Sequence, residues 1–163
     1  MKIDVHVTGG VVRGAVDGDL TVFRGIPYAS LDERFGAPGP AQAWDGVRGA
    51  TTFGPSPPQS GRFGMDSLGG QGDGWLTVNV WSPDLEGGLP VMLWIQGGAY
   101  AFGMSSLPEY DGSNLARGGV VVVTFNYRVG LEGFGYVAGT PANRGLLDQV
   151  AALEWVRENI GAF

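Results

Sequence analysis

Apolar and polar positions divide the chain into short runs that are separated by turn residues. Residues 5–7, 11–16 and 20–24 are alternating or β-branched runs, and Asp17-Gly18 lies between the second and the third. An Asp-Gly pair between such runs is typical of a two-residue hairpin turn, because it tolerates the positive φ angles of that turn. The pattern predicts a small antiparallel meander at the start of the chain.

Three later runs predict the strands of a larger sheet. Residues 76–82 alternate Thr and Asn with apolar side chains and end before a proline, as a strand does. Residues 91–95 and 120–125 are uncharged, which is typical of strands buried on both faces of a parallel sheet. Residues 112–117 between them predict a short helix with Ser113 as its N-cap. A strand, a helix and a strand in succession imply a right-handed crossover and parallel pairing.

The last predicted element is an amphipathic helix over residues 143–160. Apolar residues recur there at steps of three and four, which predicts that one face of the helix is buried. The residues of that face are Leu146, Val150, Leu153, Val156 and Ile160. Arg144 and the other charged residues of the segment lie largely on the remaining faces.

A turn of small residues follows the run at 91–95. Gln96 ends the run, and Gly97, Gly98 and Ala99 then carry almost no side chain before Tyr100. Such a bare backbone can approach another group closely and point its N–H groups at it. That group would be an anion or an oxyanion. A glycine-rich turn without a binding role would show the same residues, so the motif alone leaves both interpretations open.

The neighbourhood of this turn resembles a known family. The segments LTVNVWSP, PVMLWIQGGAY, VVVVTFNYRVGLEGF and NRGLLDQVAALEWVRENI are similar, in order and spacing, to the N-terminal part of the type-B carboxylesterases. This family includes the bacterial para-nitrobenzyl esterases and the cholinesterases, and the resemblance covers residues 9–163. It implies an α/β fold, the N-terminal portion of an α/β-hydrolase domain. A small antiparallel meander would precede a mixed or parallel central sheet with flanking helices.

The resemblance also suggests how the 163 residues are organised, as the N-terminal part of a single domain. Residues 1–53 would form the meander and a wrapping loop, and residues 75–163 would begin the central sheet. Residues 54–74 are rich in Gly, Ser and Pro, and we expect a long, partly ordered, flexible loop there. Because the family's domain is much longer, we expect a fragment that is incomplete without the strand carrying the nucleophile.

The resemblance implies chemical roles for the turn. The backbone N–H groups of Gly98 and Ala99 would bind the oxyanion of a tetrahedral intermediate, with Gln96, Gly97 and Tyr100 in supporting positions. The family usually has histidine where this chain has Gln96, and we expect the glutamine amide to hold the turn by hydrogen bonds. The Gly-x-Ser-x-Gly motif that presents the nucleophile does not occur in the 163 residues. The acid and the histidine of the triad would follow that motif, so we expect none of the triad in this chain.

Two ion pairs are implied by the family's segments. Arg34, in the segment RFGAP, would pair with Asp73, where the family has a glutamate that is one methylene longer. The alternative is that Arg34 and Asp73 do not pair and are each solvated separately. Arg128 would pair with Asp148, and the side chain of Asn126 would satisfy turn backbone.

Composition excludes several classes of function. Ten basic and sixteen acidic residues give a net charge of −6 without a basic cluster, which argues against nucleic acid as a partner. The chain has no cysteine for a disulfide or a thiolate metal site, and we expect no cofactor. Its one histidine, His6, lies in a predicted strand, and we interpret it as structural. The start lacks the apolar core of a signal peptide and no run could span a bilayer, so we expect a cytoplasmic protein without membrane contact.

The expected function is therefore that of a serine carboxylesterase segment. It would supply the oxyanion hole and gorge wall for hydrolysis of a small-molecule ester through an acyl-enzyme, completed by a C-terminal esterase segment. Alone, the chain would be inactive. A non-catalytic binding or scaffold protein on the same fold is the main alternative. A nucleotide-binding domain is a weaker one, because neither G-x-G-x-x-G nor G-x-x-x-x-G-K-[ST] is present.

Overall fold

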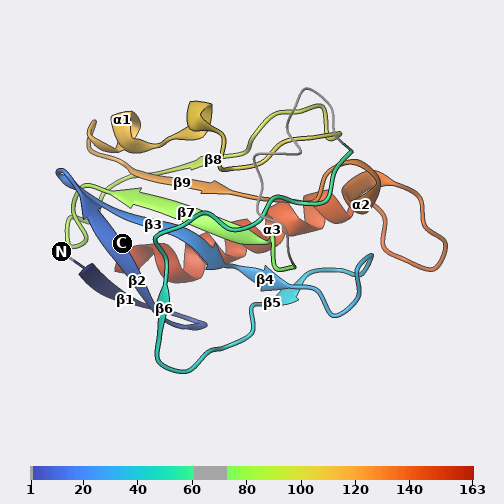
Figure 1. Cartoon of the computed structure of the whole chain (residues 1–163), viewed down its shortest axis with the longest axis horizontal. Helices are drawn as coiled ribbons and strands as arrows, with labels where there is room; N and C mark the ends of the chain where they lie inside the picture. The colour runs from blue at the N-terminus through green and yellow to red at the C-terminus, as the bar shows by residue number, and fades with distance from the viewer. Residues whose placement is uncertain (1, 61–72) are drawn as a thin grey trace.

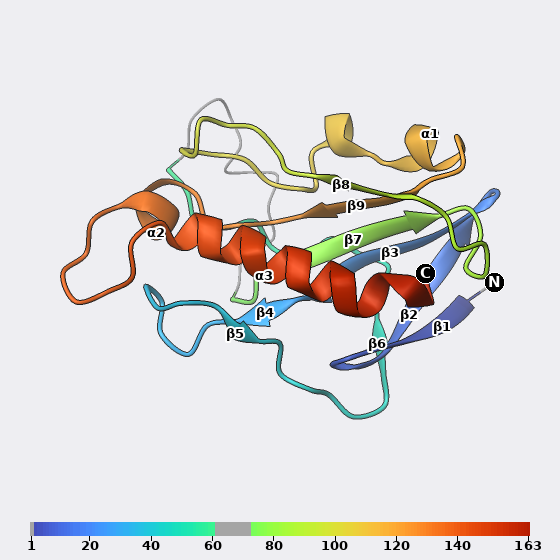
Figure 2. The ribbon, with the colours of Figure 1, turned by 180° about the vertical axis from the view of Figure 1, so that it is seen from behind.

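The computed structural model describes residues 2–60 and 73–163, which form one mixed sheet with helices on its faces (Figures 1 and 2). The seven strands of this sheet are β1 (Lys2–Val7), β2 (Gly10–Asp17), β3 (Leu20–Pro27), β6 (Val47–Gly49), β7 (Thr77–Ser82), β8 (Val91–Trp94) and β9 (Val121–Phe125). Their order is β1-β2-β3-β7-β9-β8, with β6 beside β2. A separate pair joins β4 (Ala29–Ser30) to β5 (Gly39–Pro40).

The predicted meander is confirmed. Strands β1, β2 and β3 pair antiparallel in sequence order, and Asp17 faces Leu20 across a two-residue turn. Gly18 takes a positive φ angle of 64° in that turn, as the Asp-Gly signal predicts. His6 is an exposed residue of β1, at one edge of the sheet, in keeping with its interpretation as a strand residue.

The remainder of the sheet is mixed. Strand β7 pairs antiparallel with both β3 and β9, whereas β8 and β9 pair parallel. The parallel pair is the one that the strand, helix and strand pattern predicts. Every residue of β7 and of β9 is buried, as expected of central strands.

Three α-helices and two short 3-10 helices accompany the sheet in the described ranges. They are η2 (Pro108–Tyr110), α1 (Ser113–Ala116), α2 (Gly130–Phe134), α3 (Arg144–Asn159) and η3 (Ile160–Ala162). The N-cap of α1 is Gly112, and the side chain of Asp111 accepts the N–H of Ser113. The prediction of Ser113 as the cap was therefore one residue off. No helix in these ranges is long and apolar enough to cross a bilayer.

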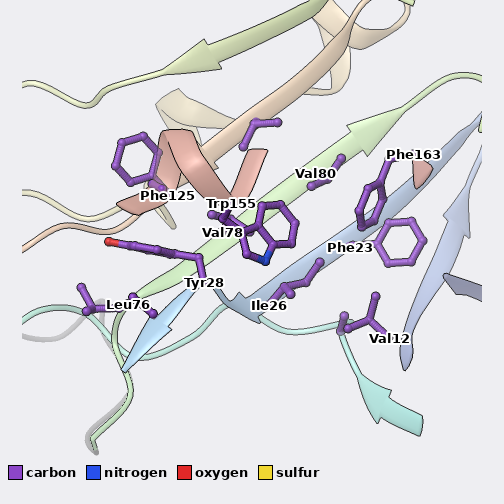
Figure 3. Close-up of a cluster of buried hydrophobic side chains, with 14 of the residues drawn as sticks. Val12, Phe23, Ile26, Tyr28, Leu76, Val78, Val80, Phe125, Trp155 and Phe163 are labelled. Carbon is purple, nitrogen blue, oxygen red and sulfur yellow. The ribbon is translucent and has the colours of Figure 1, made fainter. Parts of the chain in front are cut away.

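The core lies on both faces of the sheet. Helix α3 runs across one face, where Trp155 and Phe163 pack against side chains of β3, β7 and β9 such as Phe23, Val78 and Phe125 (Figure 3). On the other face Trp81 and Val122 pack against Ala116 of α1. The sheet is thus a middle layer between two helical layers, the arrangement of an α/β fold.

Strand β8 was predicted to be buried on both faces, but the structure shows an exposed edge strand. It pairs with β9 alone and forms the other edge of the sheet, with Val91, Trp94 and Ile95 each exposed by more than two fifths. The apolar run is typical of a central strand, but among the described residues no neighbour covers it. The predicted incompleteness of the sheet at this strand agrees with this exposure.

The predicted buried face of α3 is wrong at three of its five residues. Leu146, Val150 and Leu153 are exposed, whereas Val156 and Ile160 are half-buried and pack against the core. The buried face is instead one that the apolar pattern does not mark, formed by Arg144, Asp148, Ala152, Trp155 and Asn159. Ala152 and Trp155 belong to the core, and the polar members are bound by hydrogen-bond partners.

The predicted flexible loop at 54–74 falls largely outside the described residues, which omit residues 61–72. The part before them is tied to the sheet end by buried polar contacts. The side chain of Asn126 donates to the carbonyl of Pro55 at 3.0 Å and accepts the N–H of Ser105 at 2.7 Å. The prediction that Asn126 satisfies turn backbone is confirmed.

Candidate functional site

The turn after β8 has an unusual backbone. Gly98 has a φ angle of 137°, and Ala99 and Tyr100 follow with φ angles of 52° and 61°. A Cβ at Gly98 would lie 1.9 Å from the carbonyl oxygen of Phe102, so only glycine fits there. The carbonyl of Gly98 accepts the N–H groups of Ala101 and Phe102, which closes the turn. We call residues 97–103 the oxyanion turn.

Four consecutive N–H groups of this turn have no protein acceptor. The amides of Gly97, Gly98, Ala99 and Tyr100 donate no hydrogen bond to any described residue, whereas those of Ala101, Phe102 and Gly103 do. Ala99 is exposed and Gly98 half-buried, so the amides are not enclosed by the core. Adjacent N–H groups in a bare turn can donate together to a negatively charged oxygen.

The end of the turn is held by Gln59. Its side chain spans the peptide groups at Gly103, accepting the N–H at 2.9 Å and donating to the carbonyl at 3.1 Å. No local pattern predicts this contact, because 44 residues separate the partners and Gln59 lies in a segment without periodicity.

The start of the turn is held by Tyr127 from the end of β9. Its hydroxyl donates to the carbonyl of Gln96 at 2.7 Å. Burial raises the pKa of Tyr127 above its ordinary value, and the neighbouring Tyr100 and Tyr110 add to the shift. The phenol is therefore kept neutral, in the form that donates this bond.

Gln96 does not hold the turn as predicted. Its side chain is buried, but neither the amide oxygen nor the amide nitrogen has a hydrogen-bond partner among the described residues. The amide lies against Gly103, whose own polar groups are already bound by Gln59. The Gln96 side chain therefore contacts the turn by packing alone, and its backbone carbonyl accepts the hydroxyl of Tyr127.

The predicted pair of Arg128 and Asp148 is present and fully buried. The carboxylate of Asp148 accepts the backbone N–H and two guanidinium N–H groups of Arg128, at 2.7 to 2.9 Å. The remaining guanidinium nitrogen donates to the carbonyls of Arg34 and Gly36. The pair joins α3, the end of β9 and the loop after β4. It also explains why the charged residue Asp148 lies on the buried side of α3.

The predicted pair of Arg34 and Asp73 is a wrong assignment. Arg34 instead pairs with Glu132 of α2, to which it donates two hydrogen bonds, and the second carboxylate oxygen of Glu132 is buried without a partner. Arg34 and Asp73 line one cavity of about 760 Å³ without forming an ion pair. Glu132 reaches the arginine because α2 lies beside it, a contact 98 residues apart that no local pattern predicts.

Arg144 is a second buried arginine that the sequence analysis placed away from the buried face. Its guanidinium donates to the carbonyls of Leu131, Glu132, Gly135 and Pro141 and to the hydroxyl of Thr140. It also lies over the ring of Phe35, at 5.3 Å from the ring centre. These bonds fix α2 and the loop that follows it against the start of α3.

The sequence matches a known protein family. The model of the carboxylesterase family matches residues 2–163. The chain belongs to the carboxylesterase family. Among curated relatives, this carboxylesterase chain is 45% identical over 166 residues to the para-nitrobenzyl esterase of Bacillus subtilis, covering 94% of the chain and 34% of the relative. It is 43% identical over 176 residues to the fumonisin B1 esterase of Sphingopyxis macrogoltabida, covering 99% of the chain and 32% of the relative.

Solved structures show the same fold. A para-nitrobenzyl esterase superimposes on the carboxylesterase chain with a TM-score of 0.88 at 44% identity, over 98% of this chain and 35% of that one. The α/β-hydrolase fold predicted from the sequence is confirmed by this similarity. The carboxylesterase chain spans about one third of the length of the relatives it matches.

Proposed function

We propose that this chain supplies the oxyanion hole and part of the gorge wall of a serine esterase that hydrolyses small-molecule carboxylic esters. The observation that carries the proposal is the adjacent N–H groups of Gly98 and Ala99, two of four consecutive amides that donate to no described residue, in the turn that follows β8. When a nucleophile attacks an ester carbonyl, negative charge develops on the carbonyl oxygen. Two fixed N–H groups stabilise that charge, and each donor contributes about 3 to 4 kcal/mol in the transition state.

The surrounding residues keep these donors in place before the substrate arrives. Tyr127 holds the backbone ahead of the turn and Gln59 holds its last residue. Gly97 and Tyr100 complete the turn on either side of the donors. Preorganised donors are effective because they need no rearrangement as the charge forms.

The rest of the machinery belongs to a complementary C-terminal esterase segment, which we propose as the partner of this part of the domain. In the expected mechanism a serine from that segment attacks the ester carbonyl, the bond to the alkoxy oxygen breaks, and the alcohol leaves an acyl-enzyme behind. Water then hydrolyses the acyl-enzyme, which releases the carboxylic acid and restores the serine. The exposed β8 edge and the outer apolar face of α3 (Leu146, Val150, Leu153) are where that segment would complete the sheet and cover the helix. The 163 residues alone would be inactive.

The proposal is tested by a fusion protein. Residues 1–163 are joined to the part of the Bacillus subtilis para-nitrobenzyl esterase that the chain does not match, and hydrolysis of p-nitrophenyl acetate is measured. We expect turnover in the fusion protein and none in the 163-residue chain. A well-folded fusion protein without turnover would contradict the proposal.

Two glycine variants of the fusion protein test the turn itself. Gly98→Ala places a methyl group onto the carbonyl of Phe102 and disfavours the φ angle, so we expect activity to fall by about a hundredfold or more, as for loss of an oxyanion donor. Gly49→Ala is the matched control, because a Cβ there meets no atom within 4 Å. Labelling by a fluorophosphonate separates an enzyme from the alternative, a non-catalytic binding protein of this fold, which would not be labelled.

A further inference from the structure

Two adjacent non-glycine residues of the oxyanion turn have left-handed backbone conformations. Ala99 and Tyr100 have φ angles of 52° and 61°, a region that residues with a Cβ rarely adopt. Such a conformation persists only where the surrounding structure enforces it. The contacts that Tyr100 makes therefore bear on whether the neighbouring donors at Gly98 and Ala99 stay in place.

Helix α2 supplies those contacts. The N–H of Gly130, its first residue, donates to the carbonyl of Tyr100 at 2.6 Å. The ring of Phe134, its last residue, lies 4.7 Å from the ring of Tyr100 between centres, with an interplanar angle of 46°. Both the backbone and the side chain of Tyr100 are thus bound to one helix of five residues.

A helix this short needs support of its own, and the start of α3 provides it. A Cβ at Gly145 would lie 2.6 Å from the ring of Phe134, so the ring rests directly on the backbone of α3. The neighbouring Arg144 donates to the carbonyls of Leu131, Glu132 and Gly135, which fixes the C-terminal end of α2. The guanidinium of Arg34 donates to the side-chain carboxylate of Glu132. Contacts with Gly145, Arg144 and Arg34 therefore hold the helix in place, so that it can support Tyr100.

We propose that Phe134 is a positioning residue for the oxyanion hole. Wedged between Gly145 and Tyr100, its ring keeps Tyr100 and Ala99 in the left-handed conformation that leaves the N–H groups of Gly98 and Ala99 free for the anion. The effect of Phe134 on the conformation of the turn is argued from these contacts alone. Its effect on the rate of ester hydrolysis rests on the proposed function. Phe134 touches neither the substrate nor the reacting atoms in this scheme.

The test compares four versions of the fusion protein described above. Phe134→Ala removes the wedge, and Phe134→Leu retains part of its volume. Tyr136→Ala is the matched surface control, because it removes an aromatic ring that is 92% exposed two residues further on. Val5→Ala controls for lost stability, because it truncates a buried side chain in β1, at the sheet edge opposite β8.

Hydrogen exchange followed by mass spectrometry gives a readout that does not depend on activity. In Phe134→Ala we expect faster exchange in the peptides that cover residues 97–103 and 129–135, whose bonded amides include Ala101, Gly103 and Gly130. Tyr136→Ala and Val5→Ala should leave the exchange of 97–103 unchanged. Unchanged exchange of 97–103 in Phe134→Ala would overturn the proposal, whether or not the fusion protein is active.

Steady-state kinetics give the second readout. We expect Phe134→Ala to lower kcat by about tenfold with little change in KM, because a loosened oxyanion hole loses transition-state stabilisation and not ground-state binding. Phe134→Leu should recover part of kcat, and both controls should match the parent. A change confined to KM would overturn the kinetic role. An inactive parent whose turn still responds to Phe134→Ala would count against the proposed function and leave the positioning role standing.

Discussion

At the scale of single residues, the chain relies on polar groups that are buried and paired. Asp148 takes three hydrogen bonds from Arg128, and both side chains are fully buried. The burial of this carboxylate is offset by the three charge-assisted or backbone hydrogen bonds that it accepts. The guanidinium of Arg144 is bound by backbone carbonyls in place of an acid. These bonds join α2, the loop after β4 and the end of β9 to α3.

Removing one partner of the Arg128–Asp148 pair should be strongly destabilising. We expect Asp148→Ala to lower the free energy of unfolding by about 3 to 5 kcal/mol, because it leaves a buried guanidinium without its anion. Asp4→Ala is the matched control, since its pair with Arg13 is exposed and should contribute little. Urea unfolding of both variants in the fusion protein measures the difference. Equal losses of unfolding free energy in Asp148→Ala and Asp4→Ala would contradict the claim that burial makes the Arg128–Asp148 pair important for stability.

The hydroxyl of Tyr127 should make stability depend on alkaline pH. Its pKa is raised by burial, so above about pH 10 the unfolded chain loses this proton more readily than the folded one. The contribution of Tyr127 is fully present below that pH and is lost as the pH rises through the folded pKa. Tyr127→Phe should therefore lower stability at neutral pH by about 1 kcal/mol and flatten its alkaline decline.

Unfolding free energies at several pH values between neutral and alkaline check this expectation. Burial also raises the pKa of Tyr28 well above its ordinary value. Because Tyr28 remains in the variant, part of the fall in stability at alkaline pH should persist. Parallel curves for the parent and for Tyr127→Phe would contradict the assignment to Tyr127.

At the scale of elements, the apolar pattern marks surfaces that this part of the domain does not itself cover. Strand β8 is as apolar as β9, yet β9 is buried on both sides and β8 is an edge. The stripe of Leu146, Val150 and Leu153 on α3 is likewise exposed. In our proposal, the C-terminal esterase segment pairs with β8 and covers this face of α3.

The exposed edge should make the isolated chain associate. Unpaired N–H and C=O groups along an apolar strand favour pairing with another copy. We expect the 163-residue chain to form dimers or larger species in size-exclusion chromatography with light scattering, and Val91→Lys on β8 to shift it toward monomer. Tyr136→Lys, away from the edge, is the control and should not. A monomeric parent chain would contradict this reading of β8.

The same elements show what the sequence could predict. The meander, β9, the glycine-rich turn and the Arg128–Asp148 pair follow from local patterns and from the family's segments, and the structure has them all. The buried face of α3 could not be predicted, because its apolar stripe points away from this sheet. The partner of Arg34 was missed because Glu132 lies 98 residues further along the chain. The tertiary fold, which no local periodicity encodes, brings α2 beside the loop that carries Arg34.

At the scale of the whole molecule, the chain is the N-terminal third of a carboxylesterase fold by its similarity to longer relatives. Its sheet presents the oxyanion turn at the end where α2 and the start of α3 gather (Figures 1 and 2). In our proposal, the nucleophile arrives on a neighbouring strand beyond β8. The scaffold and the anion site would therefore be built by this part of the domain, and the attacking group by the other.

The most direct test is a crystal structure of the fusion protein after reaction with a fluorophosphonate. The phosphoryl oxygen of the adduct mimics the oxyanion. We predict that it lies about 2.7 to 3.1 Å from the backbone nitrogens of both Gly98 and Ala99, the range for oxyanion donors. A phosphoryl oxygen bound elsewhere, with those two amides donating to protein carbonyls, would contradict the account.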